Sequence, residues 1–104
     1  MALTERCYRV TMRFPRDHQF VLGHAIRKSC ISIPSNIAEG FGRHHTPEYV
    51  HHLRYSKGSN NELQTQVEVG RRVELVSEEE ATGIIGEAEE IGRMLQGLVL
   101  SLRR

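Results

Sequence analysis

The last quarter of the chain carries apolar residues at helical spacing, and this pattern constrains the fold more than any other feature. From residue 81 to 102 apolar side chains recur every three or four positions: Ala81, Ile84, Ile85, Ala88, Ile91, Leu95, Leu98, Val99 and Leu102. Such spacing places them on one face of a helix. Ser77 and Glu80 form a capping box that starts this helix. A helix with one apolar face needs other elements to cover that face.

Proline and capping residues divide the rest of the chain into three further helical segments. Residues 2–13 form a short segment that stops at Phe14-Pro15, because the residue before a proline avoids helical backbone. A second segment, from about residue 16 to 43, has an apolar face made of Phe20, Leu22, Ile26, Cys30, Ile33, Ile37 and Phe41. A third begins at Thr46-Pro47, an N-cap followed by proline at the first helical position. Its apolar face is Tyr49, Val50, Leu53, Leu63, Val67 and Val73.

Pro34 lies inside the second predicted helix. It lacks the backbone N–H that would bond the carbonyl of Cys30, and its ring crowds that carbonyl. The apolar spacing continues in phase past Pro34, so we expect a kink and not the end of the helix. Ser32 and Ser35 are the residues that we expect to satisfy the freed backbone groups.

These segments predict an all-α fold, an antiparallel up-down four-helix bundle with a short first helix and a kink at Pro34. The connections between the segments are short, and short connections join antiparallel neighbours. A length of 104 residues suits a single domain, residues 1–104. A short first helix should leave part of the neighbouring apolar stripe uncovered, and we therefore expect the bundle to self-associate.

A polar layer is expected in the middle of the bundle, where the apolar face of the third helix is interrupted. Ser59 and Glu62 should meet Asn36 and Glu39 of the second helix there and fix the register of the two helices. Alternatively, the two carboxylates would form a general acid/base pair or half of a metal site. The Glu-x-x-His motifs of bundle-core di-iron sites do not occur.

A histidine cluster surrounds the start of the third helix. Glu48 lies three and four positions before His51 and His52, so the three share a helix face, and His44 and His45 precede them. Such ligands can bind zinc. The HExxH pattern is missing, however, and we interpret the cluster as a polar surface turn. No motif names a reaction, so we predict no enzymatic activity, metal or cofactor.

Basic residues are concentrated in the first half of the chain. Residues 1–55 carry 8 Lys and Arg against 4 Asp and Glu, whereas residues 56–104 carry 6 against 9. The overall charge of +1 does not by itself demand a nucleic-acid partner. The ordinary interpretation is a solvated helix face; the alternative is a patch for phosphates. The predicted phosphate contacts are Arg13, Arg16, Arg27, Lys28 and Arg43.

No segment resembles a signal peptide or approaches the roughly 20 apolar residues of a membrane span. We therefore expect a cytoplasmic protein without membrane contact. In that compartment Cys7 and Cys30 should stay reduced, with Cys30 as a small core residue.

Several strings resemble one family. The string SIPSNIAEGFGR at positions 32–43 resembles the signature of bacterial four-helix-bundle proteins related to those encoded in intervening sequences of large-subunit ribosomal RNA genes. Phe14-Pro15, Gly58-Ser59, Glu62-Leu63 and residues 94–102 match as well, so the resemblance spans residues 14–104. The family usually has a longer first helix, and usually has Gln, Arg and Ala where this chain has Ala25, Lys28 and Ser29.

The resemblance implies a ring-forming bundle, typically a homopentamer. It also implies similarity to the accessory protein of diversity-generating retroelements, which binds nucleic acid and a reverse transcriptase. No catalytic residue is implied. The leading hypothesis is therefore a non-enzymatic oligomeric bundle that contacts RNA or DNA. The alternative is a structural or protein-interaction module without affinity for nucleic acid.

Overall fold

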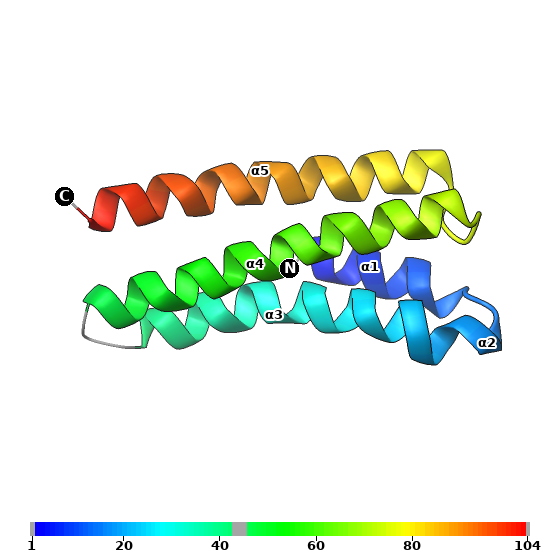
Figure 1. Ribbon diagram of the computed structural model, residues 1–104, viewed down its shortest axis with the longest axis horizontal. Helices are drawn as coiled ribbons and strands as arrows, with labels where there is room; N and C mark the ends of the chain where they lie inside the picture. Colours follow the sequence, from blue (N-terminus) through cyan, green and yellow to red (C-terminus); the bar gives the residue numbers. More distant parts are fainter. Residues whose placement is uncertain (1, 43–45, 104) are drawn as a thin grey trace.

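The computed structural model describes residues 2–42 and 46–103. The chain runs back and forth as four helical stretches (Figure 1). These are α1 (Ala2–Met12); a continuous run of α2 (Arg16–His18), the π-helical segment η1 (Gln19–Gly23) and α3 (His24–Phe41); α4 (Thr46–Arg72); and α5 (Glu78–Leu102). The described residues contain no strand. The predicted all-α up-down bundle with a short first helix is confirmed.

Local signals account for the helix ends. α1 stops at Met12, shortly before Pro15, and the buried ring of Phe14 packs into the core. The predicted capping box of α5 is present: Ser77 Oγ accepts a 3.0 Å hydrogen bond from the Glu80 N–H, and Glu80 Oε1 accepts one of 3.0 Å from the Ser77 N–H. The residue types at these positions therefore decided where the helices begin and end.

The π-helical segment changes which side chains face the core. The apolar spacing placed Phe20 on the buried face of the second helix, but its side chain is 82% exposed. A π-helical turn holds more residues than an α-helical turn, and so it rotates the residues before it relative to those after it. Ile26, which follows the segment, is buried as predicted.

α3 continues through Pro34, as the apolar spacing predicted. The bend of the helix at this point stays a prediction. The carbonyl of Cys30, which Pro34 cannot bond, accepts a 3.3 Å hydrogen bond from Thr4 Oγ1 of α1. A residue from another helix, and not the expected Ser32 or Ser35, therefore supplies this bond.

The core has two parts because α1 covers only half of the bundle. One cluster joins Leu3, Cys7 and Val10 of α1 to residues of the other helices. The second cluster, around Val50, Leu53, Leu95 and Val99, contains no residue of α1. Figure 1 shows α1 beside one half of α3 only. Phe41, placed on the buried face by its spacing, is 75% exposed in the half that α1 does not reach.

Among the described residues, no helix combines the length and the apolar character that a membrane span requires.

Candidate nucleic-acid interface

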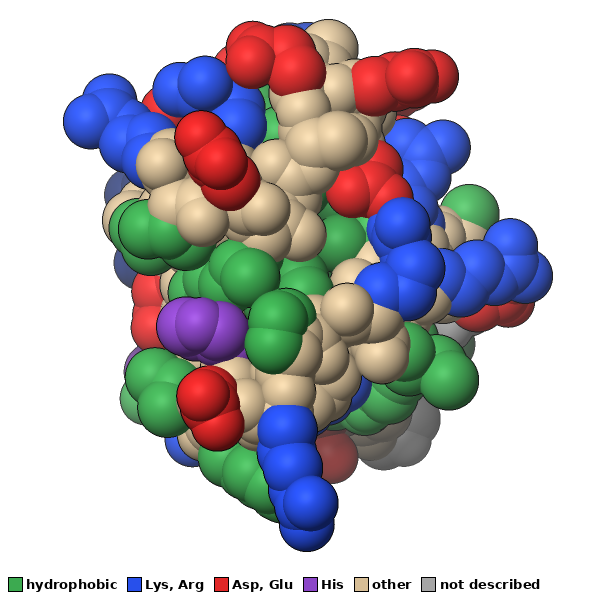
Figure 2. Space-filling view, turned by 90° about the vertical axis from the view of Figure 1, so that its right-hand side faces the viewer, with side chains coloured by type: hydrophobic (Ala, Val, Ile, Leu, Met, Phe, Trp, Pro, Cys, Tyr) green, Lys and Arg blue, Asp and Glu red, His purple; other side chains and the backbone are tan. Residues whose placement is uncertain are grey.

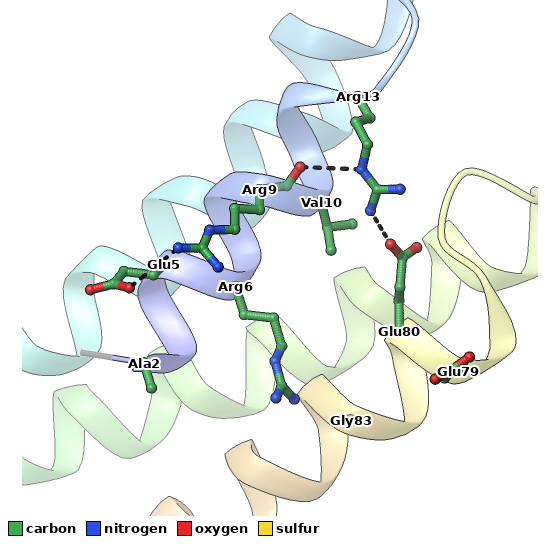
Figure 3. A pocket seen from close by; sticks show the side chains of 9 residues that line it. All are labelled: Ala2, Glu5, Arg6, Arg9, Val10, Arg13, Glu79, Glu80 and Gly83. Carbon is green, nitrogen blue, oxygen red and sulfur yellow. Dashed lines mark hydrogen bonds and ion pairs between the residues drawn. The ribbon is translucent and has the colours of Figure 1, made fainter.

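Arg13, at the end of α1, is exposed but already has an acidic partner. Its Nη2 forms an ion pair with Glu80 Oε2, and its Nε donates a 3.4 Å hydrogen bond to the carbonyl of Arg9 (Figure 3). Partial burial opposes ionisation of Glu80, but the Ser77 backbone N–H and the Arg13 guanidinium outweigh it and hold the pKa of this carboxyl below its ordinary value. The positive charge of Arg13 is therefore largely neutralised within the protein.

Figure 3 shows the surroundings of Arg13, a hollow of about 600 Å³ between α1 and the start of α5. Two more arginines of α1 line it. Arg6 Nη1 lies 3.2 Å from Glu87 Oε1, and Arg9 Nη2 lies 3.9 Å from Glu5 Oε2. A phosphate entering this hollow would compete with a carboxylate at each arginine. The hollow is therefore lined by ion pairs, and it is a poor site for an anion.

Arg27 has a structural role, because it bonds another residue of the same helical run. Its side chain is half-buried, and it donates hydrogen bonds of 2.9 Å to the carbonyl of Gln19 and 3.1 Å to Gln19 Oε1. Gln19 Nε2 in turn donates to the carbonyls of Thr11, at 2.8 Å, and Phe14, at 2.9 Å. Arg27 therefore holds the π-helical segment and the turn after α1 together, which is a structural use of a residue that we predicted as a phosphate contact.

Arg16 and Lys28 remain as exposed cations. Neither forms an ion pair with any other residue in the described part of the chain. Phe20 and His24 stand between them on the same helical run and are also exposed. These four exposed residues follow one another along this helical run, and we call them the row. The fifth predicted contact, Arg43, lies outside the described residues.

The end of the bundle that carries Arg16 is not a continuous basic surface. Figure 2 shows Lys and Arg side chains spread around this end with Asp and Glu side chains between them. Arg71 Nη2 lies 2.6 Å from Glu68 Oε2, and Arg72 Nε lies 3.1 Å from the same oxygen. Arg71, and then Arg72, lower the pKa of Glu68 to about 2. Positive charge is compensated locally here, as it is around Arg13.

Polar side chains connect α3 and α4 in the middle of the bundle. Asn36 Nδ2 donates 2.9 Å hydrogen bonds to the carbonyl and the Oγ of Ser32, and Ser59 Oγ donates a 2.7 Å bond to Ser32 Oγ. His52 Nδ1 lies 3.2 Å from Asn36 Oδ1. Asn36 and Ser59, both bonded to Ser32, therefore connect α3 to α4.

Two fully buried side chains complete this layer. Ser56 Oγ donates a 2.8 Å bond to the carbonyl of Ile33, and Asn60 Nδ2 donates a 2.8 Å bond to the carbonyl of Ala88. Glu39 and Glu62 are both exposed. Each lies two positions from a core-facing residue. Two positions correspond to about 200° around a helix, so the side chain points away from the core.

No group of three His, Cys, Asp or Glu within residues 2–42 and 46–103 could hold a metal ion. His44 and His45 lie outside the described residues. The rings of His51 and Tyr55 meet edge to face, with centroids 4.6 Å apart. The exposed positions of Glu39 and Glu62 do not provide the enclosed carboxylate pair that acid/base chemistry would use.

The apolar spacing assumes a regular helix from residue 16 onward and therefore places Phe20 on the buried face. His24 is not among the residues that the sequence analysis singles out. Nothing in the residue types at positions 19–23 signals the π-helical turn. In the structure, contacts of Gln19 with the end of α1 and with Arg27 accompany this turn.

Comparisons with known proteins bear on this surface and fold. The model of the family described as "23S rRNA-intervening sequence protein" matches residues 1–97. No curated protein matches the chain significantly. A crystal structure of a protein of unknown function from the S23 ribosomal protein family of Bacteroides thetaiotaomicron VPI-5482 superposes with a TM-score of 0.77 at 20% identity. The match covers 93% of this chain and 97% of that chain, and it shows a shared fold. The chain belongs to the 23S rRNA-intervening sequence protein family.

Proposed function

We propose that this chain is a non-enzymatic, homo-oligomeric helical scaffold of the cytoplasm that contacts RNA or DNA through the row Arg16, Phe20, His24 and Lys28. The observation that carries the proposal is the exposure of this row and the lack of acidic partners for Arg16 and Lys28 among the described residues. The cations would bind phosphates. Phe20, with 82% of its surface exposed, offers a face on which a base can stack.

The dimensions of the row suit a nucleic-acid strand. Twelve residues separate Arg16 from Lys28, and an α-helix rises about 1.5 Å per residue, so the row extends at most roughly 18 Å, because its π-helical turn holds more residues. That length corresponds to about five phosphates of one strand in a duplex. Two or three contacts of this kind give weak binding. Repetition of the row around an oligomer would raise the affinity through the high effective concentration of linked sites.

The oligomer that we propose is a homopentamer, as the family resemblance implies. The support from this chain is its exposed apolar surface, in which Phe41 and Met94 line one groove. Monomeric proteins rarely expose large contiguous apolar patches. Light scattering coupled to size-exclusion chromatography measures the number of copies, and a monomer would contradict the proposal.

RNA binding is tested with the double variant Arg16→Gln/Lys28→Gln in a gel-shift or anisotropy titration against ribosomal and random RNA. We expect several-fold weaker binding than for the wild type and a smaller dependence of log K on log salt, by about 0.7 for each lost phosphate contact. The matched control is Arg93→Gln, because Arg93 is an exposed cation of α5 outside the row. An equal loss in variant and control would overturn the row as the contact surface.

A second candidate, a protein-interaction module without affinity for nucleic acid, is favoured by the ion pairs of Arg6, Arg13 and Arg71, which leave little free positive charge. An intact oligomer that shifts neither ribosomal nor random RNA at low salt would select this candidate.

A further inference from the structure

Two cysteines lie in the core where α1 packs against α3. Cys7 belongs to α1 and Cys30 to α3, and both are members of the same buried apolar cluster. Both thiols are free, and neither residue has more than 1% of its surface exposed. The proposed function uses neither of them. Two thiols in one cluster have an oxidation chemistry that a single buried thiol lacks, because they can form a disulfide with each other.

The packing of the two helices brings the cysteines opposite each other. α1 and α3 lie side by side and run in opposite directions (Figure 1). Thr4 Oγ1 bonds the carbonyl of Cys30 at 3.3 Å, and Gln19 Nε2 bonds the carbonyl of Thr11 at 2.8 Å. Cys7 lies between Thr4 and Thr11 on α1. It therefore faces the stretch of the second helical run between Gln19 and Cys30.

The side chain of Cys30 points back along this stretch. Its Sγ lies 3.3 Å from the carbonyl oxygen of Arg27, one turn earlier in α3. A hydrogen bond between the two thiols lowers the pKa of Cys30 and raises the pKa of Cys7. Burial adds to the rise at Cys7 and opposes the lowering at Cys30. Of the two, Cys30 is therefore the thiol that ionises more readily, and the thiolate is the reactive form.

Cys30 also lies at an opening of the surface. It is one of the residues that line an apolar groove of about 660 Å³ between α3 and α5, next to Leu3 and Thr4 of α1. Cys7, in contrast, has none of its surface exposed. A small oxidant that enters the groove therefore meets Cys30 first, with Cys7 behind it.

We propose that Cys7 and Cys30 are a peroxide-sensitive thiol pair, and that their oxidation to a disulfide fixes α1 on α3. The Cys30 thiolate attacks one oxygen of hydrogen peroxide, the O–O bond breaks, and a sulfenic acid and hydroxide form. Cys7 Sγ then attacks Cys30 Sγ, the S–O bond breaks, and the leaving hydroxide takes the Cys7 proton and becomes water. In sum, two thiols are oxidised to one disulfide, and the peroxide is reduced to two molecules of water.

α1 is the element whose attachment this bond changes most. It has 11 residues, and isolated helices shorter than about 12 residues are marginal in water. α1 is therefore stable only while it is packed, and a helix of this kind opens more often than the centre of the core does. A disulfide between positions 7 and 30 opposes this opening, because it keeps α1 tethered to α3 even when the contacts around it break.

The first test is chemical and needs no substitution. The reduced protein is treated with a small excess of hydrogen peroxide, its remaining thiols are alkylated, and its mass is measured. The product should be lighter than the reduced protein by two hydrogen atoms, and digestion should give one linked pair of peptides that contain Cys7 and Cys30. Added oxygen atoms without a link, a link between two copies, or thiols that react only after denaturation would overturn the proposal.

The second test concerns the unequal roles of the two thiols. Cys7→Ala keeps Cys30 without its partner, so its oxidation should stop at the sulfenic acid, seen as one added oxygen atom. Cys30→Ala keeps only the thiol with the raised pKa and should react about tenfold more slowly or less. Equal rates would contradict the order of attack. Circular dichroism checks the fold, and serine at the same position replaces any alanine variant that does not fold.

The third test measures the effect on α1. The disulfide form should unfold at a temperature higher by on the order of 10 °C than the reduced form, and dithiothreitol should reverse the rise. Peroxide-treated Cys7→Ala is the matched control and should show no rise. Amide hydrogen exchange in α1 should become slower in the disulfide form. A disulfide form with the same or a lower unfolding temperature would show that the bond does not fix α1. None of these outcomes depends on the oligomeric state or on RNA binding.

Discussion

Thr4 Oγ1 donates a 3.3 Å hydrogen bond to the carbonyl of Cys30, and this is the carbonyl that Pro34 leaves without its helical donor. A proline inside a helix costs about 3 kcal/mol, in part because it removes one hydrogen bond. Here a hydroxyl from α1 restores that bond from outside the helix. The same hydrogen bond therefore attaches α1 to α3 and replaces the helical bond that Pro34 cannot make.

Replacement of Thr4 by valine should destabilise the protein. Valine keeps the shape of threonine but cannot donate, so the carbonyl of Cys30 loses its partner at the α1–α3 contact. We expect the free energy of unfolding to fall by about 1–2 kcal/mol in a urea titration. Thr82→Val is the control, because Thr82 is exposed on α5, and it should change stability by less than about 0.5 kcal/mol.

The link between Thr4 and Pro34 is tested by a double-mutant cycle. Pro34→Ala provides an N–H that can bond the carbonyl of Cys30 within the helix. Thr4→Val should therefore cost less in the Pro34→Ala background than in the wild type. Equal costs in the two backgrounds would show that Thr4 stabilises the fold independently of the proline.

Two glycines in helices should respond oppositely to alanine. A Cβ at Gly40 would lie 2.8 Å from His52 Cβ and 2.9 Å from Tyr49 Cδ1, where α3 approaches α4 closely. Gly40→Ala should therefore destabilise the protein by about 1–3 kcal/mol. At Gly58, no atom lies within 4 Å of such a Cβ among the described residues. Gly58→Ala should raise the stability by up to about 1 kcal/mol. Thermal unfolding of both variants would show the opposite signs.

Arg27 should behave as a structural residue. Arg27→Met keeps the apolar stem but removes the bonds to Gln19, and we expect a loss of about 1–2 kcal/mol in the free energy of unfolding. Lys28→Gln, the neighbouring exposed cation, should leave stability unchanged. If RNA affinity fell in Arg27→Met under conditions where the protein is fully folded, Arg27 would instead belong to the phosphate contacts.

Stability should decline in acid through Glu68 and Glu80. Both carboxyls have a pKa below the ordinary value of 4.5 in the folded protein, and that of Glu68 is lowered to about 2, mainly by Arg71. A depressed pKa means that the folded state binds fewer protons than the unfolded state. The stabilisation is complete above pH 4.5 and is lost as the pH falls toward 2. Unfolding titrations of wild type and Glu68→Gln across this range should show a flatter profile for the variant, and added salt should shrink the difference.

Local sequence signals predicted most of the fold. The capping box at Ser77 and Glu80, the proline after Phe14 and the apolar spacing from residue 81 to 102 each concern hydrogen bonds or faces within one helix. Residues close in the chain decide such features, and so the sequence shows them directly. The helix ends and the bundle class therefore needed no knowledge of how the helices pack.

Most of the errors concern contacts between distant segments. Gln19 donates hydrogen bonds to carbonyls at and after the end of α1, and its own carbonyl accepts one from Arg27. The π-helical turn that begins at Gln19 exposes Phe20. Phe41 is exposed because α1 does not extend beside it. Glu39 and Glu62 are close to core residues in the sequence, but their side chains lie on exposed faces of their helices.

The sequence by itself determined that this protein is a helical bundle of four stretches, because helix periodicity and caps are encoded within a few neighbouring residues. Only the tertiary structure decided which arginines keep a free charge and where the apolar surface stays open. Both depend on contacts between segments that are distant in the chain: Glu80 meets Arg13, Gln19 joins Arg27 to the end of α1, and Met94 stays exposed. The spacing of residues along one helix does not show which distant side chains will be in contact.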